Sequence, residues 1–376
     1  MLPRLVDQYT YKDILEAYLD CTKRKRNTYT AIAFSVNFES KLRKLLDEIN
    51  SNTYQIGPSR GFVVTFPKPR EVWAAQFRDR IVHHLVCRDL APFYHSRFIN
   101  TNCACIEGRG TLYATEYLTK FCRQATENWS KTAWALQFDI HNFFVSINRS
   151  VLWEILVKDI GETSLTSRLL KQIIFNNPTQ GCIVKPGTNF SLVPKHKSLW
   201  FAPKDCGLPI GDLTSQLCAS GVYLDGLDKF VKHTLKCKWY VRYVDDGVLL
   251  AHDKTQLQEW LGQIEEWLKT RRKIMLSPSK TTIKPLSGGI NFAGAYILPF
   301  RTYPRKMTIS RAIQAAKALH KAPFDKHLLA SINSYIGMMR HANAFKLRAK
   351  LCRIAQVPYI LEYNRDYTKV YNIVSI

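Results

Sequence analysis

Apolar residues recur at two different spacings along this chain, and each spacing predicts one kind of secondary structure. A recurrence every three or four positions indicates an amphipathic helix. That pattern occurs in five segments: Tyr11–Asp20, Glu39–Asn50, Phe77–Leu90, Leu217–Val231 and Leu257–Leu268. The last segment is the most regular, with leucine and tryptophan on one face, and that face is expected to pack in a core.

Continuous apolar runs bounded by turn residues predict strands instead. Phe62–Phe66 is such a run and is followed by Pro67, and Trp134–Asp139 is another that ends in a carboxylate. The stretch Trp239–Ala251 contains two apolar runs on either side of Asp245-Asp246-Gly247. This arrangement predicts a β-hairpin with two carboxylates at its tip.

Three further segments complete the expected architecture. Residues 176–206 are rich in Pro, Gly, Asn, Ser and Lys and show no periodicity, so we expect a long surface insertion. Met275–Ile297 predicts two strands joined through Ser287-Gly288-Gly289, and the tail from Arg301 is expected to be helical and basic. The order of elements predicts an α+β protein with a central antiparallel sheet, not a doubly wound parallel sheet.

The charge of the chain narrows its class of partner. Among 376 residues, 54 are Lys or Arg and 30 are Asp or Glu, which gives a net charge of +24. So large an excess indicates a polyanionic partner, because a phosphate backbone releases counterions when cations bind it. Nucleic acid is favoured over a membrane surface, since no amphipathic basic anchor helix stands out.

Other features concern the cellular compartment. We find no apolar run long enough to cross a bilayer, and the N-terminus lacks the apolar core of a signal peptide. Ten cysteines are scattered without the spacing of a zinc site. We therefore expect a cytoplasmic protein with reduced cysteines and no membrane partner.

Three acidic residues are candidates for catalysis. Asp139 ends one predicted strand, and Asp245 with Asp246 lies at the tip of a hairpin far away in the sequence. An antiparallel sheet can bring a strand end beside a hairpin tip. Three converging carboxylates offer the oxygen ligands that Mg²⁺ prefers, and two such ions can support phosphoryl transfer. The alternative for an isolated Asp-Asp pair is an ordinary polar turn.

Five ordered groups of residues resemble the sequence boxes of reverse transcriptases, especially bacterial ones. Tyr243-Val244-Asp245-Asp246 resembles their catalytic box, and Phe138–Ile147 is similar to the box with their first catalytic aspartate. The other similar segments are Phe66–Val72 with Phe77–His84, Leu208–Gln216, and Leu276–Thr281 with Gly289–Gly294. The resemblance spans about residues 35 to 300 and outweighs the polar-turn interpretation. It implies a right-hand polymerase with fingers, palm and a short helical thumb.

The resemblance also implies roles for individual residues. Asp139 and Asp245 would be the main ligands of two Mg²⁺ ions (Mn²⁺ is the alternative), with the Ile140 carbonyl as a further ligand and Asp246 in a peripheral position. Lys280 would be a general acid for the leaving pyrophosphate. Residues expected to bind the incoming dNTP are Lys68, Arg70, Phe144, Ile210 and Gln216. Residues expected to contact nucleic acid are Arg78, Arg80, Lys195, Lys197, Arg340, Lys346 and Arg348.

Alternatives stay open for several of these residues. Lys68, Arg70 and Lys280 are also compatible with a solvated charged strand, and Phe144 with an aromatic core position. If Phe144 lies beneath the sugar, as the resemblance implies, its ring excludes a 2′-hydroxyl and selects dNTPs. His83 and His84 are adjacent on a predicted helix and point about 100° apart, so we expect no shared metal ion.

Ile210 is informative about the subgroup. Retroviral enzymes usually carry Gln at this place, whereas an aliphatic residue before Gly-x-Leu-Thr-Ser-Gln resembles the reverse transcriptases of diversity-generating retroelements and related bacterial enzymes. Losing a polar contact to the nucleotide predicts low fidelity. Asp212 in place of Asn, Gly247 in place of Phe, and Ala293-Gly294 in place of Leu-Gly depart from that group.

The sequence is compatible with more than one biological role. The first is cDNA synthesis from a dedicated structured RNA, as in a diversity-generating retroelement. The second is antiphage defence, with DNA made from an associated noncoding RNA. An RNA-dependent RNA polymerase would favour a small or polar residue at Phe144, and a non-catalytic RNA-binding protein would not explain three placed carboxylates.

The expected organisation has three parts. Residues 1–133 would form an N-terminal extension and the fingers, 134–300 the palm with its insertion at 176–206, and 301–376 a basic thumb. The expected partners are a structured RNA template, a primer, the cDNA product and dNTPs. The short thumb also suggests an accessory protein or a second reverse transcriptase.

Overall fold

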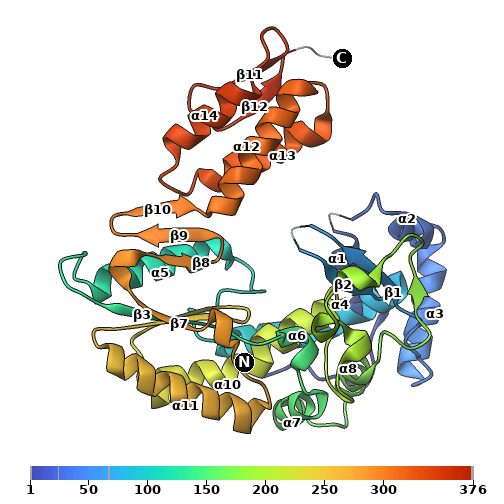
Figure 1. Cartoon of the computed structure of the whole chain (residues 1–376). Coiled ribbons are helices and arrows are strands. Elements are labelled where there is room, and N and C mark those ends of the chain that lie inside the picture. Colours follow the sequence, from blue (N-terminus) through green and yellow to red (C-terminus); the bar gives the residue numbers. More distant parts are fainter. Residues whose placement is uncertain (1, 24, 67, 374–376) are drawn as a thin grey trace. The chain divides into compact units, whose positions relative to one another are not determined.

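The computed structural model describes residues 2–23, 25–66 and 68–373 (Figure 1). The chain divides into two compact units, each made of segments that are distant in the sequence. Unit 1 comprises residues 1–107, 138–236 and 260–281, and unit 2 comprises residues 108–137, 237–259 and 282–376. Together they contain helices and mainly antiparallel sheets, which confirms the predicted α+β class.

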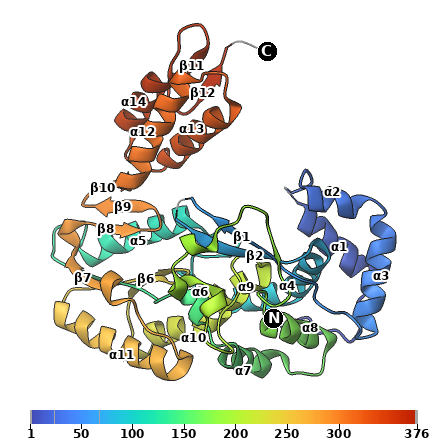
Figure 2. The same cartoon turned by 45° about the vertical axis from the view of Figure 1, so that its right-hand side comes forward.

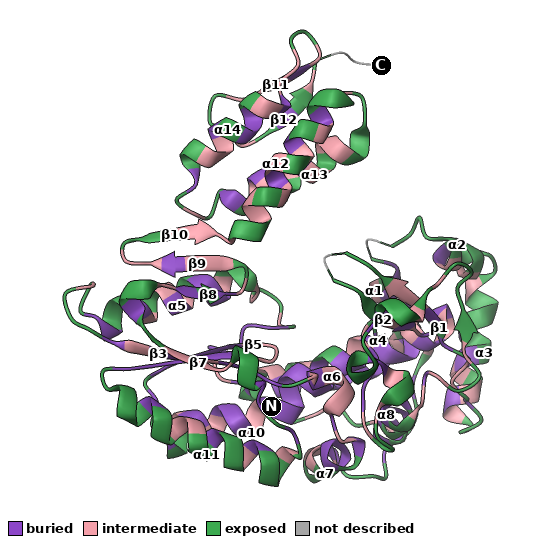
Figure 3. Ribbon diagram, viewed as in Figure 1, coloured by how far each residue is buried: buried purple, intermediate pink, exposed green. Residues whose placement is uncertain are grey.

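Unit 1 is mainly helical and is organised around one long helix. Its α-helices are α1 (Tyr11–Thr22), α2 (Tyr29–Ser35), α3 (Phe38–Asn50), α4 (Phe77–Arg97), α6 (Phe143–Ser146), α7 (Arg149–Ile160), α8 (Leu165–Phe175), α9 (Leu213–Ser215) and α10 (Leu224–Lys229). The π-helical segments η4 (Gln216–Tyr223) and η5 (Phe230–Thr234) flank α10. Helix α4 contacts α1, α2, α8, α9 and η4 and is buried along most of its length (Figure 3).

A small sheet in unit 1 has the order β2-β1-β4. Strand β1 (Arg60–Val64) pairs antiparallel with β2 (Arg70–Ala74), and Phe62 stands opposite Val72. The predicted strand Phe62–Phe66 is therefore placed two residues too late. The register joins Val64 to Arg70, so Thr65 and Phe66 belong to the turn between the strands.

The predicted insertion at residues 176–206 is attached to this sheet. Its short strand β4 (Ile183–Val184) extends β1 in parallel, and the 3₁₀ turns η1 (Phe190–Leu192), η2 (Lys195–Lys197) and η3 (Leu199–Phe201) follow. The ring of Trp73 stacks on Phe190 with centroids 5.5 Å apart and meets Trp200 edge-on at 5.2 Å. The insertion thus packs as an ordered layer on the face of β2 that carries Trp73, although its sequence has no periodicity.

Gly61 explains how the Trp73 ring fits against β1. A Cβ atom at Gly61 would come within 2.5 Å of the Trp73 ring. Trp73 itself is fully buried, and its indole Nε1 donates to Glu71 Oε2 at 3.2 Å. The same carboxylate oxygen accepts a hydrogen bond from the Leu199 backbone N–H at 3.0 Å. This pair of contacts fixes the insertion to β2.

Unit 2 contains a four-stranded sheet with the order β5-β6-β3-β7. Its strands are β3 (Trp134–Asp139), β5 (Trp239–Tyr243), β6 (Asp246–Ala251) and β7 (Thr282–Pro285), although the last two residues of β3 belong to unit 1. Helix α5 (Thr111–Ala125) packs against β5 and β6. Helix α11 (Lys254–Arg272) follows β6 and continues into unit 1. Figure 2 shows α5 and α11 together with β6 and β7.

The C-terminal part of unit 2 has its own core. A sheet of order β10-β9-β8 is formed by β8 (Ile290–Phe292), β9 (Ala295–Leu298) and β10 (Arg301–Pro304). Helices α12 (Lys306–Lys321), α13 (Lys326–Met339) and α14 (Phe345–Ala355) then pack around buried Ile332, Ile336 and Leu351. The hairpin β11 (Leu361–Tyr363) and β12 (Val370–Asn372) closes this core with Leu361 and Val370.

One expectation for this region needs correction, and a second is confirmed in part. The tail from Arg301 is not wholly helical, because it begins with β10 and ends with the β11–β12 hairpin. The two strands expected within Met275–Ile297 are β7 and β8, and they lie in different sheets, with η7 (Leu286–Gly288) between them. The 3₁₀ turn changes the chain direction, which alternation of apolar residues alone does not reveal.

Candidate active site

Asp139 lies at the end of β3 with little exposure and a cationic partner. Its side chain is 11% exposed, and Oδ2 is 2.6 Å from Lys280 Nζ. Its backbone carbonyl accepts a hydrogen bond from the Ser277 N–H at 2.8 Å. The next residue, Ile140, is fully buried and forms a β-bridge with Leu276. Asp139 and Lys280, each expected to be catalytic, are therefore in direct contact within unit 1.

Lys280 reaches Asp139 because the chain folds into a short turn before β7. The 3₁₀ turn η6 (Pro278–Lys280) begins with proline, and the Lys280 N–H bonds to the Ser277 carbonyl at 3.0 Å. The Lys280 side chain is 59% exposed, so one ammonium contacts the carboxylate while remaining open to solvent. An ammonium in this position can both neutralise Asp139 and meet an anionic ligand.

Phe144 lies shortly after Asp139 in the chain and is held in place by contacts of its ring and its backbone. Asn142 adopts a left-handed conformation with φ +48°, which starts helix α6. Phe143 is buried, whereas Phe144 is partly exposed and meets the Phe143 ring at a centroid distance of 5.4 Å. The Phe144 carbonyl accepts the Leu208 N–H at 2.8 Å. The Phe144 side chain is thus neither fully buried in the core nor fully exposed at the surface.

The loop Leu208–Gln216 is fixed between α6 and strand β2. The Trp73 N–H donates to the Ile210 carbonyl at 3.3 Å. Gly211 has φ +124°, a conformation that favours glycine. The backbone of Ile210 is therefore tethered, and its partly exposed aliphatic side chain is presented from a defined position.

Buried Arg149 binds the backbone immediately before this loop. Its Nε donates to the Gly207 carbonyl at 2.8 Å, and Nη2 donates to the Cys206 carbonyl at 3.3 Å. Burial lowers the pKa of Arg149 from its usual value, and Asp205 partly opposes that effect. The sequence analysis did not identify Arg149. The only available indication was a basic residue after Asn148 at the start of an apolar helix.

Asp212 is the buried acid of the loop. It precedes α9, and burial raises its pKa to about 7, although a hydrogen bond with the Ala75 backbone and the charge of Arg80 lower it. Thr214 Oγ1 is 2.7 Å from Nδ1 of His83. Burial also lowers the pKa of His83 to about 4, so the ring is neutral and structural near pH 7. Gln216 is exposed where η4 begins.

The predicted hairpin is present in unit 2. Strands β5 and β6 pair antiparallel from Trp239 opposite Leu250 to Tyr243 opposite Asp246. The turn consists of Val244 and Asp245, so Asp246 is the first residue of β6. Val244 has φ +57°, a left-handed conformation that is costly for a β-branched residue. Both aspartates are partly exposed.

Arg242 supports this strained turn and was missed by the sequence analysis. Its side chain is fully buried in β5, and Nη1 donates to the Val244 carbonyl at 2.6 Å. A single cation inside the run Trp239–Val244 was the available signal. Because an unpaired carbonyl there would be costly, Arg242 is a positioning residue for the turn that carries Asp245.

The remaining predicted residues have varied surroundings. Lys68 and Arg70 are exposed at the β1–β2 turn, next to Pro67, which lies outside the described residues. Arg78 forms an ion pair with Glu48, and Arg80 Nε donates to the Ala75 carbonyl at 2.9 Å. The side chains of Lys195, Lys197, Arg340 and Lys346 are exposed.

Two of the expected nucleic-acid contacts also bind within the chain. Lys195 lies 5.5 Å from the centroid of the Phe201 ring, in a cation–π contact. Arg348 Nη1 donates to the Asp366 carbonyl at 3.0 Å. Together with Arg78 and Arg80, Lys195 and Arg348 are therefore partly engaged in holding the fold together, which a charge count along the sequence does not show.

The three predicted carboxylates are divided between the units. Asp139 belongs to unit 1, whereas Asp245 and Asp246 belong to unit 2. Within residues 2–23, 25–66 and 68–373, no group of three or more His, Cys, Asp or Glu side chains is arranged to hold a metal ion. The donor chemistry of Asp139, Asp245 and Asp246 nevertheless suits a hard divalent cation, because all three side chains supply carboxylate oxygens.

Comparison with protein families identifies the chain. A family described as reverse transcriptase (RNA-dependent DNA polymerase) matches residues 67–297, more than half of the chain. The matched region includes Asp139, Asp245, Asp246 and Lys280. The protein belongs to this family of nucleotidyltransferases. It is an RNA-directed DNA polymerase, which uses an RNA template and dNTPs, as the sequence analysis predicted.

A search among curated proteins gave no match. Among the helices of the described chain, none is long and apolar enough to span a membrane.

Proposed function

We propose that this enzyme makes cDNA from a dedicated structured RNA and does so with low fidelity, as in a diversity-generating retroelement. The observation that carries this proposal is Ile210. Its backbone is tethered to Trp73, and an aliphatic side chain stands where retroviral relatives present Gln. Without a hydrogen-bonding side chain, the loop can check the shape of the new base pair less strictly.

The right-hand organisation belongs to the same proposal. Residues 1–133 would supply the N-terminal extension and fingers, 134–300 the palm, and 301–376 the thumb. The separate core around Ile332, Ile336 and Leu351 supports a thumb that folds as one body. The attachment of residues 176–206 to β1 and β2 supports a functional link between the insertion and the fingers.

Asp139, Asp245 and Asp246 would hold divalent metal, with the Ile140 carbonyl as a further ligand. The sheet order, in which β6 neighbours β3, supports a shared role for these residues. Two bound Mg²⁺ or Mn²⁺ ions would supply activation of the attacking oxygen and stabilisation of the leaving one. Lys280, already at Asp139, would donate a proton to the departing pyrophosphate.

The dNTP would be bound by residues of unit 1. Lys68 and Arg70 would contact its triphosphate from the β1–β2 turn, where both are exposed. Phe144 would lie beneath the sugar and exclude a 2′-hydroxyl, and the hydrogen bond from Leu208 to its carbonyl supports a fixed position. Gln216 and Ile210 would complete the nucleotide side of the site.

The template and primer would be bound by cations, of which Lys195, Lys197, Arg340 and Lys346 are exposed. In the fingers and insertion the cations are Arg78, Arg80, Lys195 and Lys197, and in the thumb they are Arg340, Lys346 and Arg348. The net charge of +24 supports binding along a phosphate backbone. An accessory protein or a second reverse transcriptase would extend this surface.

The role in the cell is tested by sequencing nucleic acid that copurifies with the enzyme. Under the proposal, one structured RNA dominates, and its cDNA carries many substitutions relative to the template. cDNA that copies one noncoding RNA faithfully would instead favour antiphage defence. A mixture of unrelated cellular RNAs would contradict both roles.

Fidelity is tested directly by the substitution Ile210→Gln. The proposal expects the variant to misincorporate several-fold less often than the wild type on the same RNA template, because a polar contact to the nucleotide is restored. Ile210→Leu is the matched control and should keep the wild-type error rate. An unchanged spectrum of errors in Ile210→Gln would overturn the low-fidelity proposal.

A further inference from the structure

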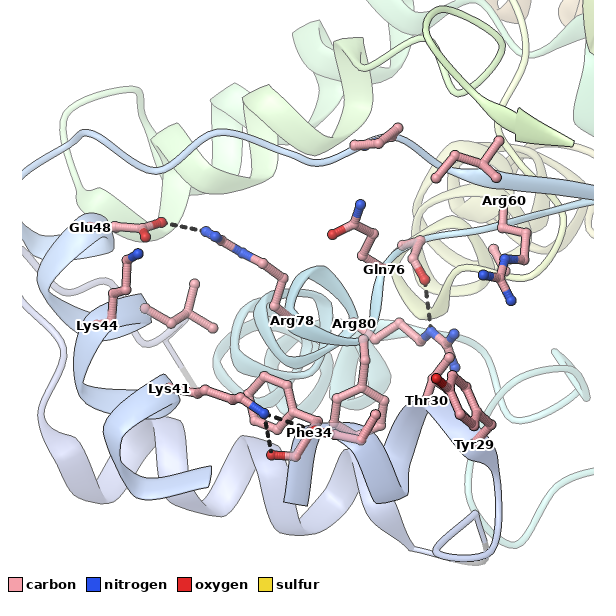
Figure 4. A pocket seen from close by; sticks show the side chains of 17 residues that line it. Tyr29, Thr30, Phe34, Lys41, Lys44, Glu48, Arg60, Gln76, Arg78 and Arg80 are labelled. Carbon is pink, nitrogen blue, oxygen red and sulfur yellow. Dashed lines mark hydrogen bonds and ion pairs between the residues drawn. The ribbon is translucent and has the colours of Figure 1, made fainter. Parts of the chain in front are cut away.

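A cavity in unit 1 lies apart from the residues assigned to DNA synthesis, except for Arg78 and Arg80. It has a volume of about 480 Å³ and is lined by α2, α3, β1, the end of β2 and the first turn of α4. The apolar lining includes Phe34, Leu45 and Phe77. Cavities of this size accommodate small organic ligands, and Figure 4 shows this one with its lining side chains.

The lining is strongly cationic. It contains five basic residues and one acid: Lys41, Lys44, Arg60, Arg78, Arg80 and Glu48. Glu48 forms an ion pair with Arg78. In the described chain, none of the other four basic side chains forms an ion pair with a carboxylate. An excess of four positive charges therefore surrounds one cavity, which points to a multiply charged anion.

Two of these cations are held in place by neutral groups. Lys41 Nζ donates to the carbonyls of Ala33 and Val36 at 2.8 and 2.7 Å. Arg80 Nε donates to the Ala75 carbonyl at 2.9 Å, and its guanidinium lies 5.9 Å from the centroid of the Phe77 ring. Carbonyl partners orient these side chains without cancelling their charge.

The cavity has distinct sides in Figure 4. Arg60 and Arg80 stand on the side of Tyr29, whereas Lys44 and Arg78 stand on the side of Glu48. Gln76 lies between the two groups in this view and precedes α4 without forming a side-chain cap. The positive end of the α4 dipole adds to the potential of the side chains. Tyr29 is 83% exposed, and its ring is available to a planar group.

We propose that this cavity binds the terminal phosphate of a nucleotide, with its base against the exposed Tyr29 ring. Charge favours a terminal phosphate over a backbone phosphodiester. A phosphodiester carries one negative charge, whereas a phosphomonoester carries about 1.5 to 2 at pH 7, which matches the cationic excess better. A concave site also admits the end of a strand more readily than its continuous middle.

A terminal nucleotide phosphate can come from two sources. The nucleotide is either the 5′-phosphorylated end of an RNA strand or a free nucleotide in solution. In both cases the site is separate from the one proposed for polymerisation. Binding at the cavity needs neither Asp139 nor Asp245, so its test can fail or succeed independently of the proposed function.

The test measures binding by the full chain carrying Asp245→Asn, in EDTA, so that no metal-dependent dNTP binding contributes. The first probe is a short fluorescent oligoribonucleotide, compared with and without a 5′-phosphate. The second is GMP, compared with guanosine, as a competitor. The cavity is altered by Lys44→Gln with Arg60→Gln, two exposed residues outside the proposed catalytic and dNTP sites.

The matched control removes two exposed charges elsewhere in unit 1, by Lys12→Gln with Lys158→Gln. Thermal unfolding of both double variants confirms that each is folded. We expect the wild-type cavity to bind the 5′-phosphorylated RNA about tenfold more tightly than the hydroxyl form, as one charge-assisted contact would give. The cavity variant should lose this preference and the control should keep it.

The competition experiment with GMP and guanosine identifies the source of the phosphate. Displacement of the labelled RNA by GMP but not by guanosine shows that free nucleotide binds. Preference for the phosphorylated RNA without such displacement assigns the cavity to a strand end. The proposal is overturned if the wild type shows neither a 5′-phosphate preference nor competition by GMP. It is equally overturned if the control variant loses the preference as fully as the cavity variant.

Discussion

Lys280 Nζ lies 2.6 Å from Oδ2 of Asp139, although 140 residues separate them in the chain. The contact depends on η6, which turns the chain back toward the end of β3 after Leu276 has paired with Ile140. A lysine at a strand-end carboxylate gives that acid a counter-charge. It also leaves a partly exposed ammonium beside the proposed reaction site, where an anionic leaving group can meet it.

We expect Lys280→Gln to lower kcat for dNTP addition about 100-fold, because the leaving pyrophosphate would lose its proposed proton donor. The variant's thermal stability should change little, since the ion pair is largely exposed on the lysine side. Lys284→Gln on β7 removes a neighbouring exposed charge and is the control. Equal single-turnover rates in Lys280→Gln and wild type would exclude the acid role.

Arg242 is expected to be essential for the stability of the β5–β6 turn. Arg242→Met removes the donor to the Val244 carbonyl and should lower the free energy of unfolding by about 3 kcal/mol. DNA synthesis should fall as well, because Asp245 loses its positioned turn. Denaturant titration checks the first effect, with the exposed Lys238→Met as comparison. Wild-type stability in Arg242→Met would contradict this role.

Asp212 should give the protein an unusual pH dependence. Its pKa is raised to about 7 in the folded state, so folding favours the protonated acid. Between the unfolded pKa of about 4 and pH 7, the folded state binds more protons than the unfolded chain. Stability from this group is therefore present at low pH and is lost as pH rises through that window.

Asp212→Asn mimics the protonated acid and should remove this dependence. We expect the free energy of unfolding at pH 8 to increase by about 2 kcal/mol, with little change at pH 4. Thermal melts across this pH range measure the difference between variant and wild type. A difference that does not change with pH would show that Asp212 does not titrate in this window.

Phe144 is expected to set the choice of sugar. Phe144→Ala removes the ring that is proposed to lie beneath the sugar, so the preference for dNTPs over ribonucleotides should fall by about tenfold or more. Phe144→Tyr keeps a ring of similar size and should retain the preference. The measurement is kcat/KM for matched dNTP and ribonucleotide pairs. An unchanged preference in Phe144→Ala would assign this residue to packing alone.

Apolar spacing was sufficient to predict much of the fold. The helix expected at Glu39–Asn50 is α3, and the strand expected at Trp134–Asp139 is β3 with the same ends. The hairpin around Asp245 is also present. These elements are predictable because α3 buries one face, whereas β3, β5 and β6 are buried at most of their positions, and the two kinds of apolar spacing record these two patterns.

Contacts between distant segments were not predictable in the same way. The insertion at residues 176–206 has no periodicity because it is held by a few aromatic and backbone contacts to β2, including those of Trp73 and Glu71. Arg149 and Arg242 each hold a loop by donating hydrogen bonds to backbone carbonyl groups. Every residue has such a carbonyl group, so the sequence does not show which one a distant arginine will bind. The roles of Asp139 and Lys280 were expected only from the family resemblance, and their direct contact was not predicted.

The most direct test of the account is primer extension on an RNA template with the wild type and Asp245→Asn. Asn keeps the size of the side chain but removes the charge proposed to bind metal. We expect the wild type to extend with dNTPs and not with ribonucleotides. The variant should lose more than about 10³-fold in rate while it still binds template and primer. Extension by Asp245→Asn at the wild-type rate would contradict the proposed mechanism.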